Sequence, residues 1–174
     1  HSKGVTVIED CYNANPDSMK AALAMFKEFH CKRRFALLGD MLELGELSRE
    51  AHEELGRQAA GAGLTGLVTY GPEAARTAEA ARAAGLADVV HAGDYQQAAD
   101  ALLATGLRRV FISLGGDGVF AADHSGRVHV PCCPGEMVNT TGCGDAGMAA
   151  IAWAYLEGTG LEDTARAAMA AGAI

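Results

Sequence analysis

The chain has 174 residues, 49% of them hydrophobic, which is enough for the packed core of one ordinary domain and excludes a disordered protein. Its 14 basic and 22 acidic side chains give a net charge of −8 at pH 7, so it lacks the positive surface with which proteins bind nucleic acids or anionic lipids. We therefore expect neither a nucleic-acid partner nor a membrane partner.

The beginning of the chain and its cysteines predict a cytoplasmic protein. Residues 1–4 lack the apolar core of a signal peptide, and His followed by Ser in place of Met is typical of the remnant of a cleaved tag. The five cysteines are an odd number in a chain too large to need disulfides, so we expect reduced thiols. A zinc site from Cys132, Cys133, His124 and His129 is the alternative. Adjacent cysteines rarely reach one tetrahedral ion, so we predict no metal site.

Up to about residue 104, short apolar runs alternate with segments of helical periodicity. The runs 5–8, 35–38, 66–70 and 88–91 are expected to be strands, and their continuous hydrophobicity is typical of parallel strands that helices cover on both faces. The segments expected to be helices are 16–29, 48–62, 72–84 and 94–104. This order predicts a right-handed, doubly wound parallel sheet.

Local signals mark where these helices begin. Asn15 precedes Pro16, which combines a capping side chain with a proline at the first helical position. Ser48 is expected to cap the second helix. Asp94, with Gln97 three residues later, resembles a capping box at the start of the fourth.

The pattern changes in the second part of the chain. A fifth strand is expected over 109–114 as an extension of the parallel sheet. The turn 115–118 is expected to lead from it into strand 119–122, and a second turn, 123–126, into strand 127–130, which makes an antiparallel hairpin. An irregular stretch and two Ala-rich helices are then expected, over residues 131–141, 144–157 and 161–171. The predicted fold class is α/β: three α/β/α layers around a doubly wound, mainly parallel, Rossmann-like sheet with an antiparallel hairpin at one edge.

The strongest chemical signal is the segment 139–145, Asn-Thr-Thr-Gly-Cys-Gly-Asp, which leads into a helix. Its small residues let backbone N–H groups converge at the helix N-terminus, where the helix dipole attracts an anion. Asp145 is placed to accept a proton from a hydroxyl, so the pattern favours phosphoryl transfer to an alcohol. The alternative is an ordinary helix start capped by Thr141. The glycine spacing also matches a dinucleotide fingerprint, but no strand directly precedes it.

Two loops that follow expected strands are further candidates. Asp10, Asn13 and Asn15 lie in a loop at the carboxyl end of the first strand, where doubly wound folds bind ligands. The alternative is a plain strand-to-helix turn capped by Asn15. The loop 39–45 contains two carboxylates, which either hold a cation or form an exposed acidic loop.

Two motifs in the first part carry a family resemblance: Asp-Cys-Tyr-Asn-Ala-Asn-Pro-Asp-Ser-Met at 10–19, and Leu-Gly-Asp-Met-Leu-Glu-Leu-Gly at 38–45, followed by Ser48 and His52. Residues 4 to about 103 resemble the C-terminal domain of the Mur ligase that adds D-alanyl-D-alanine to the UDP-MurNAc tripeptide in peptidoglycan synthesis. The resemblance implies a Rossmann-like domain that closes over ATP held mainly by a central domain. It also implies that Asp10 lies near the ATP ribose and the asparagine loop near the closing active site.

Two later motifs resemble another family: Ser-Leu-Gly-Gly-Asp-Gly-Val at 113–119 and Val-Asn-Thr-Thr-Gly-Cys-Gly-Asp at 138–145. Residues from about 107 to 174 resemble the PfkB (ribokinase-like) carbohydrate kinases, most closely pseudouridine kinase. The resemblance implies an anion hole for the transferred phosphoryl group and makes Asp145 the general base on the sugar hydroxyl. Cys143 and Gly147 depart from the family, which usually has alanine and phenylalanine there.

Neither family contains the other's segment, and the junction falls near residues 104–108. We expect a single composite domain over residues 1–174, built from a Mur-ligase-like fragment at 1–104 and a kinase-like fragment at 105–174. An engineered or selected chimera is the simplest explanation, and a natural fusion is the alternative.

The resemblances imply that neither parent's active site is complete. We therefore expect a scaffold with no evolved activity and no required cofactor, in which Asp145 is a vestigial base. The alternative is a module that binds ATP with magnesium, or phosphate, weakly. The residues predicted to bind nucleotide or phosphate are Gly142, Cys143, Gly144, Asp10, Asn13 and Asn15. A homodimer is an alternative to a monomer, through a surface that contains Cys132, Cys133, Met137, Val138 and Met148.

Overall fold

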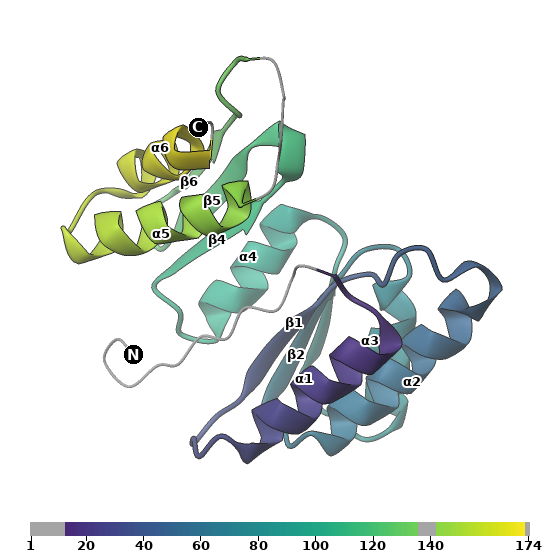
Figure 1. The fold of residues 1–174 in the computed structure, drawn as a ribbon. Coiled ribbons are helices and arrows are strands. Elements are labelled where there is room, and N and C mark those ends of the chain that lie inside the picture. Colours follow the sequence, from purple (N-terminus) through teal and green to yellow (C-terminus); the bar gives the residue numbers. More distant parts are fainter. Residues whose placement is uncertain (1–12, 136–141, 173–174) are drawn as a thin grey trace. The chain divides into compact units, whose positions relative to one another are not determined.

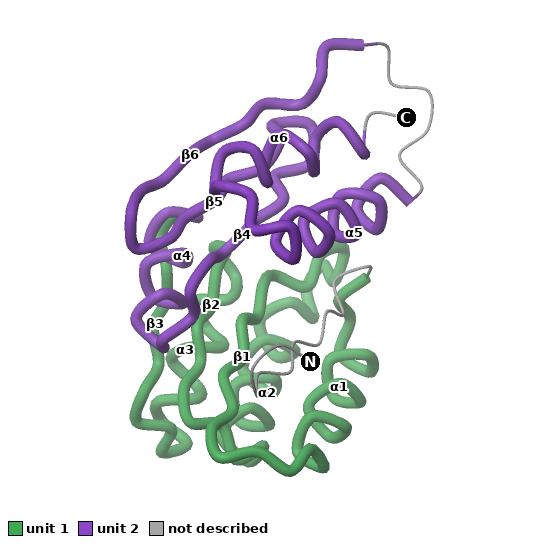
Figure 2. Tube along the Cα trace, turned by 90° about the vertical axis from the view of Figure 1, so that its left-hand side faces the viewer, with its two compact units in different colours: residues 1–94 green, residues 95–174 purple. Residues whose placement is uncertain are grey.

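The computed structural model describes residues 13–135 and 142–172, and the chain divides into two compact units, His1–Asp94 and Tyr95–Ile174 (Figures 1 and 2). Each unit contains one three-stranded sheet. None of the helices in these ranges is long and apolar enough to cross a membrane. Two compact units can unfold together as one domain or separately as two. The prediction of a single composite domain therefore stays a prediction.

Unit 1 is built on a parallel sheet of order β1-β2-β3. Its strands and helices are β1 Phe35–Leu38, β2 Gly66–Tyr70, β3 Val89–Ala92, α1 Pro16–Glu28, α2 Ser48–Gly61 and α3 Ala74–Ala83, with a 3-10 turn at Gly45–Leu47. The α/β class and the three parallel strands are confirmed. The strand expected over 5–8 lies outside the described residues.

Helix α1 begins as its sequence predicts, whereas α2 does not. The side chain of Asn15 accepts the N–H of Ser18 at 2.9 Å, and the Ser18 hydroxyl accepts the N–H of Asn15 at 3.1 Å, which completes a capping box. The predicted cap at Ser48 is wrong, because no side-chain cap precedes α2 and the Ser48 hydroxyl donates to Glu73 Oε2 at 3.0 Å. The 3-10 turn Gly45–Leu47 runs directly into the helix, so Ser48 has a helical backbone and is the first residue of α2, not its cap.

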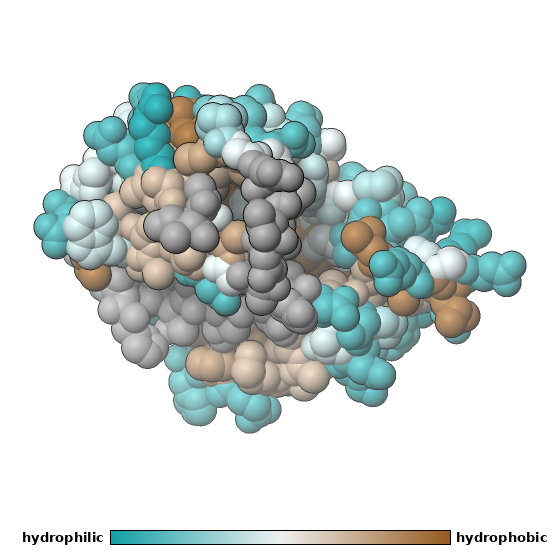
Figure 3. Space-filling view, turned by 45° about the horizontal axis from the view of Figure 1, so that its top comes forward, coloured by the Kyte–Doolittle hydropathy of each residue, from teal (hydrophilic) through white to brown (hydrophobic). Residues whose placement is uncertain are grey.

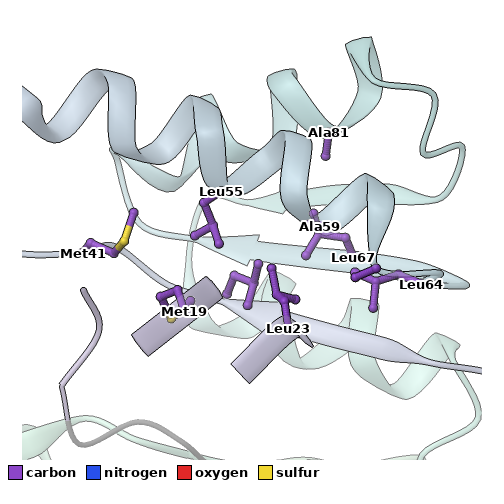
Figure 4. Close-up of a cluster of buried hydrophobic side chains, with 10 residues drawn as sticks. Met19, Leu23, Met41, Leu55, Ala59, Leu64, Leu67 and Ala81 are labelled. Atoms are coloured by element: carbon purple, nitrogen blue, oxygen red, sulfur yellow. The ribbon is translucent and has the colours of Figure 1, made fainter. Parts of the chain in front are cut away.

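The apolar core of unit 1 lies where α1 and α2 meet the sheet (Figure 4). Its buried members are Met19, Leu23, Leu38, Met41, Leu55, Ala59, Ala62, Leu64, Leu67 and Ala81. Figure 4 shows Met19 and Leu23 of α1 reaching the same cluster as Leu55 of α2 and Leu67 of β2. This packing fixes the ends of the parallel strands, and with them the loops that follow.

Unit 2 places an antiparallel sheet of order β4-β5-β6 between helices. Its elements are α4 Tyr95–Ala104, β4 Arg109–Ser113, β5 Val119–Asp123, β6 Arg127–Val130, α5 Cys143–Leu156 and α6 Leu161–Gly172. Val110 and Phe120 belong to a cluster with α4, whereas Val119 and Ala121 belong to a cluster with α6. Alternate residues of the strands thus cover the two faces, as the pleat requires.

The turn expected after the strand at 109–114 is confirmed, and the place of this strand in the parallel sheet stays a prediction. β4 pairs antiparallel with β5. The reason is the connection between them, a 3-10 turn at Gly115–Asp117 followed by Gly118 at a φ of +100°. This turn sends the chain directly back, so the nearest partner of β4 is the strand that follows it.

On the face drawn in Figure 3, hydrophilic residues alternate with small groups of hydrophobic ones. Such a mixture is ordinary, because more than half of a folded protein's accessible surface is contributed by apolar atoms. Single exposed apolar residues therefore need no functional explanation, and only contiguous groups do.

Asp123 organises the turn between β5 and β6. Its Oδ1 accepts hydrogen bonds from the Ser125 hydroxyl at 2.6 Å, the Ser125 N–H at 2.8 Å and the Gly126 N–H at 3.1 Å. Its Oδ2 lies 3.6 Å from Nε of Arg109. These contacts, with the Ser125 hydroxyl first, hold the pKa of Asp123 below its ordinary value.

We expect acid to destabilise the wild-type chain more than the Asp123→Asn variant. The folded-state pKa of Asp123 lies below the unfolded value, so its contribution to stability is complete above the ordinary carboxyl pKa of about 4 and is lost as the pH falls through the folded pKa. Urea unfolding of both proteins between about pH 7 and about pH 3 measures this difference. Two curves that fall in parallel over this range would contradict it.

Candidate functional site

Three loops of unit 1 line a cavity of about 370 Å³ at the carboxyl ends of β1, β2 and β3. Its lining residues are Gly39, Asp40, Tyr70, Gly71, Pro72, His91, Ala92 and Gly93. Open α/β sheets bind ligands at this edge, and the volume lies at the small end of the range for small-molecule pockets. The cavity is therefore the first candidate site.

Asp40 holds two of these loops together. Its Oδ1 accepts the N–H of Ala74, the first residue of α3, at 2.7 Å. Gly71 lies against the same carboxylate, since a Cβ atom there would come within 2.6 Å of Oδ2. Glu43, the second carboxylate of the loop, is exposed. No group of three His, Cys, Asp or Glu side chains in the described part of the chain is placed to hold a metal ion.

His52 fixes the Asp40 loop from inside the protein. Its side chain is fully buried, with 0% exposed. Met41 donates its N–H to Nε2 of His52 at 3.0 Å, and Nδ1 lies 2.7 Å from the carbonyl oxygen of Ser48. Because an amide N–H only donates and a carbonyl only accepts, these partners assign the ring proton to Nδ1. His52 therefore positions the loop, a role that its place in the sequence motif did not indicate.

Sequence reasoning missed two polar side chains of the cavity, Tyr70 and His91. Nδ1 of His91 lies 3.0 Å from the hydroxyl of Thr69, which is fully buried. Tyr70 ends β2 and is 38% exposed. Neither belongs to a motif, but both stand near the carboxyl ends of strands that the apolar pattern had located. Strand ends were the one signal that could have found them.

Asn13 and Asn15 of the first loop are not among the residues that line the cavity. Asn13 is exposed, and Asn15 is half-buried with its side chain engaged in the capping box of α1. Asp10 lies outside the described residues. The capping role of Asn15 is thus observed, whereas a nucleotide-binding role for these residues stays a prediction.

The predicted anion site forms the first turn of α5 in unit 2. Gly142 precedes the helix at a φ of +84° and, as a glycine, has no side chain that could cap the helix. Gly142, Gly144 and Asp145 are exposed, and Cys143 is half-buried beside Gly172 at the end of α6. Asp145 has no hydrogen bond or ion pair with the described residues. These four residues are consecutive and lie in one turn, so their role in anion binding stays a prediction. Thr141 lies outside the described residues.

Comparisons with known proteins find two families. Residues 1–115 match the family model described as Mur ligase, glutamate ligase domain, and residues 74–174 match the pfkB family carbohydrate kinases. The two matches share residues 74–115. Both resemblances predicted from sequence motifs are therefore confirmed.

Curated relatives match a part of the chain. It is 47% identical over 73 residues to the UDP-N-acetylmuramoyl-tripeptide--D-alanyl-D-alanine ligase of Mycobacterium tuberculosis, covering 39% of this chain and 14% of the ligase. It is 39% identical over 79 residues to the ligase of the same name from Bacillus subtilis, covering 45% of this chain and 17% of the ligase. The chain thus spans less than a fifth of the length of these relatives.

Solved structures of both kinds of enzyme are similar to this chain. The MurF ligase from Thermotoga maritima in complex with ADP is 31% identical, with a TM-score of 0.50, over 62% of this chain and 23% of that chain. Ribokinase from Thermotoga maritima is 22% identical, with a TM-score of 0.45, over 81% of this chain and 49% of that chain.

Proposed function

This chain belongs to the Mur ligase glutamate ligase domain family over residues 1–115 and to the pfkB carbohydrate kinase family over residues 74–174, and on that basis we propose that it is an engineered or selected chimeric α/β scaffold with no catalytic activity of its own. The residues common to both matches form α3, β3, α4 and β4. A crossover within them joins two α/β fragments in a stretch of sequence that both families accept. The boundary between the units, after Asp94, lies in the same stretch.

The observation that carries the proposal is the setting of Asp145. Its carboxylate is exposed, and no hydrogen bond or ion pair joins it to the described residues. A general base by itself contributes about 10²- to 10⁴-fold to a rate, whereas holding the reactants in position supplies about 7–11 kcal/mol. None of the described residues supplies that positioning beside Asp145, and this supports the proposal that Asp145 is a vestigial base.

A second candidate function is weak binding of phosphate, or of ATP with magnesium, at Gly142–Asp145. The position of these residues at the start of α5 favours it, because N–H groups at a helix N-terminus attract anions. Asp145 opposes it, since its negative charge lies in the same turn. We therefore expect millimolar or weaker affinity and no cofactor requirement for folding.

A titration of ATP with magnesium, followed by amide chemical shifts, tests both candidates. In the wild-type chain we expect shifts confined to the first turn of α5, with half-saturation at about 1 mM or above. Asp145→Ala should bind at least as tightly, because it removes a repelling charge. No ADP should form in the presence of pseudouridine or ribose.

Saturation below about 100 μM, together with ADP formation that Asp145→Ala abolishes, would overturn the scaffold proposal. The absence of any shift at about 10 mM would eliminate the binding module and leave the scaffold alone.

We also propose that the chain is cytoplasmic and has no nucleic-acid or membrane partner. The support is its net charge of −8, which makes contact with polyanionic surfaces unfavourable.

A further inference from the structure

Helix α5 is apolar on all its sides. Its 14 residues include one charged side chain, Asp145. Gly147 and Ala154 are buried, and Gly147 faces α6, since a Cβ atom there would lie 3.5 Å from the carbonyl oxygen of Ala168. A surface helix of a globular protein normally turns a polar side to water, and a helix that is hydrophobic all round is normally buried all round.

The other side of α5 is an exposed apolar surface, here called the α5 face: Met148, Ala149, Ala152, Trp153 and Leu156. Its spacing of three and four residues places all five on one side of the helix. Met148 is 42% exposed, Trp153 63% and Leu156 80%. Together these three side chains expose about 400 Å² of mostly apolar surface, the size of patch that often marks an interaction site on a monomer.

We propose that the α5 face is the contact surface of a homodimer in which the α5 helices of two copies pair antiparallel about a twofold axis at Ala152. About this axis Met148 of one copy lies opposite Leu156 of the second copy, and the reverse holds by symmetry. Ala149 and Ala152 carry small side chains, so the helices approach closely and leave room for Trp153 of the second copy. Bulky and small residues on one face make it self-complementary.

The area and the charge both favour a second copy as the occupant. In the dimer, the three large side chains of each α5 face together bury about 800 Å² of accessible surface. The smaller residues around them raise the total buried area toward the roughly 1,000 Å² that a specific interface needs. Each copy carries a net charge of −8, so copies repel unless they meet where charge is absent. Between Asp145 and Glu157 the helix has no charged side chain. The dimer is therefore weak, and added salt strengthens it by screening the repulsion.

Light scattering and tryptophan fluorescence across a concentration series test this dimer. We expect the mean mass to rise from 18.0 kDa toward twice that value between about 10 μM and about 1 mM. Trp153 is the only tryptophan of the chain, so its emission should move to shorter wavelength over the same range as it leaves water. Leu156→Glu and, independently, Met148→Lys should abolish both changes.

Leu42→Glu is the matched control, because Leu42 is 73% exposed in unit 1 and its replacement adds the same charge as Leu156→Glu. This variant should dimerise like the wild type. A mass of 18.0 kDa at every concentration would overturn the proposal, and so would a dimer that Leu156→Glu leaves intact. Trp153 shielded from a soluble quencher in the monomer would also overturn it, because the face would then be covered within its own chain.

Discussion

Replacing Gly56 with alanine is expected to lower the free energy of unfolding by about 2–3 kcal/mol, because α2 and α3 meet at this glycine. A Cβ atom there would overlap the carbonyl oxygen of Thr77 and lie 2.7 Å from Cβ of Ala80 and 2.9 Å from the nitrogen of Ala81. None of these atoms rotates out of the way, so the helices must separate. The higher helix propensity of alanine adds about 1 kcal/mol to the free energy of unfolding, which is too little to offset the overlap.

Gly61→Ala is the matched control within the same helix. Nothing lies within 4 Å of a Cβ atom at this position, so we expect a gain of up to about 1 kcal/mol from helix propensity alone. Urea unfolding followed by circular dichroism measures both variants. Equal stability of the two would mean that α2 and α3 do not approach closely at Gly56.

These two glycines show what the sequence could predict and what it could not. Gly56 and Gly61 both lie in a segment of helical periodicity, and no local signal distinguishes them. Their difference depends on α3, which packs against one and not the other. Where the signal is local, prediction succeeded: Asn15 and Pro16 located the start of α1, and Gly66–Tyr70 was predicted to the residue.

The pairing of β4 required information that an apolar run does not contain. The residues of Arg109–Ser113 suit a buried strand of either kind, so their hydrophobicity located the strand without its direction of pairing. The tight connection at Gly115–Gly118 decided the outcome, because it leaves no length for a crossover helix. The glycines of this connection are a local signal, and they predicted the turn from this strand into the next.

The two candidate sites also differ in whether a local sequence pattern was enough to predict them. Gly142–Asp145 is a continuous motif at a helix start, so a local pattern was enough to bring its residues together. The cavity in unit 1 combines Asp40, Tyr70 and His91 from the ends of three strands. Only the order of the sheet makes them neighbours, and composition and spacing do not specify that order.

Replacing Gly118 with alanine is expected to cost about 3–5 kcal/mol, the sum of backbone strain and overlap. Gly118 has a φ of +100° and a ψ of −139°, a region that only glycine occupies without strain. A Cβ atom there would overlap the carbonyl oxygen of Val130 and lie 2.7 Å from Cα of Pro131. Gly126→Ala, in the turn between β5 and β6, has open space and should change stability by less than about 0.5 kcal/mol.

Calorimetry of Gly118→Ala and Gly56→Ala together tests whether the chain is a single composite domain. Gly56 lies in unit 1 and Gly118 in unit 2. If the units unfold as one, each replacement lowers the temperature of the same calorimetric transition. Two transitions, each moved by the replacement in its own unit, would refute the composite domain. Proteolysis near residue 106 that leaves a folded first fragment would refute it as well, because a composite domain does not survive the loss of half its core.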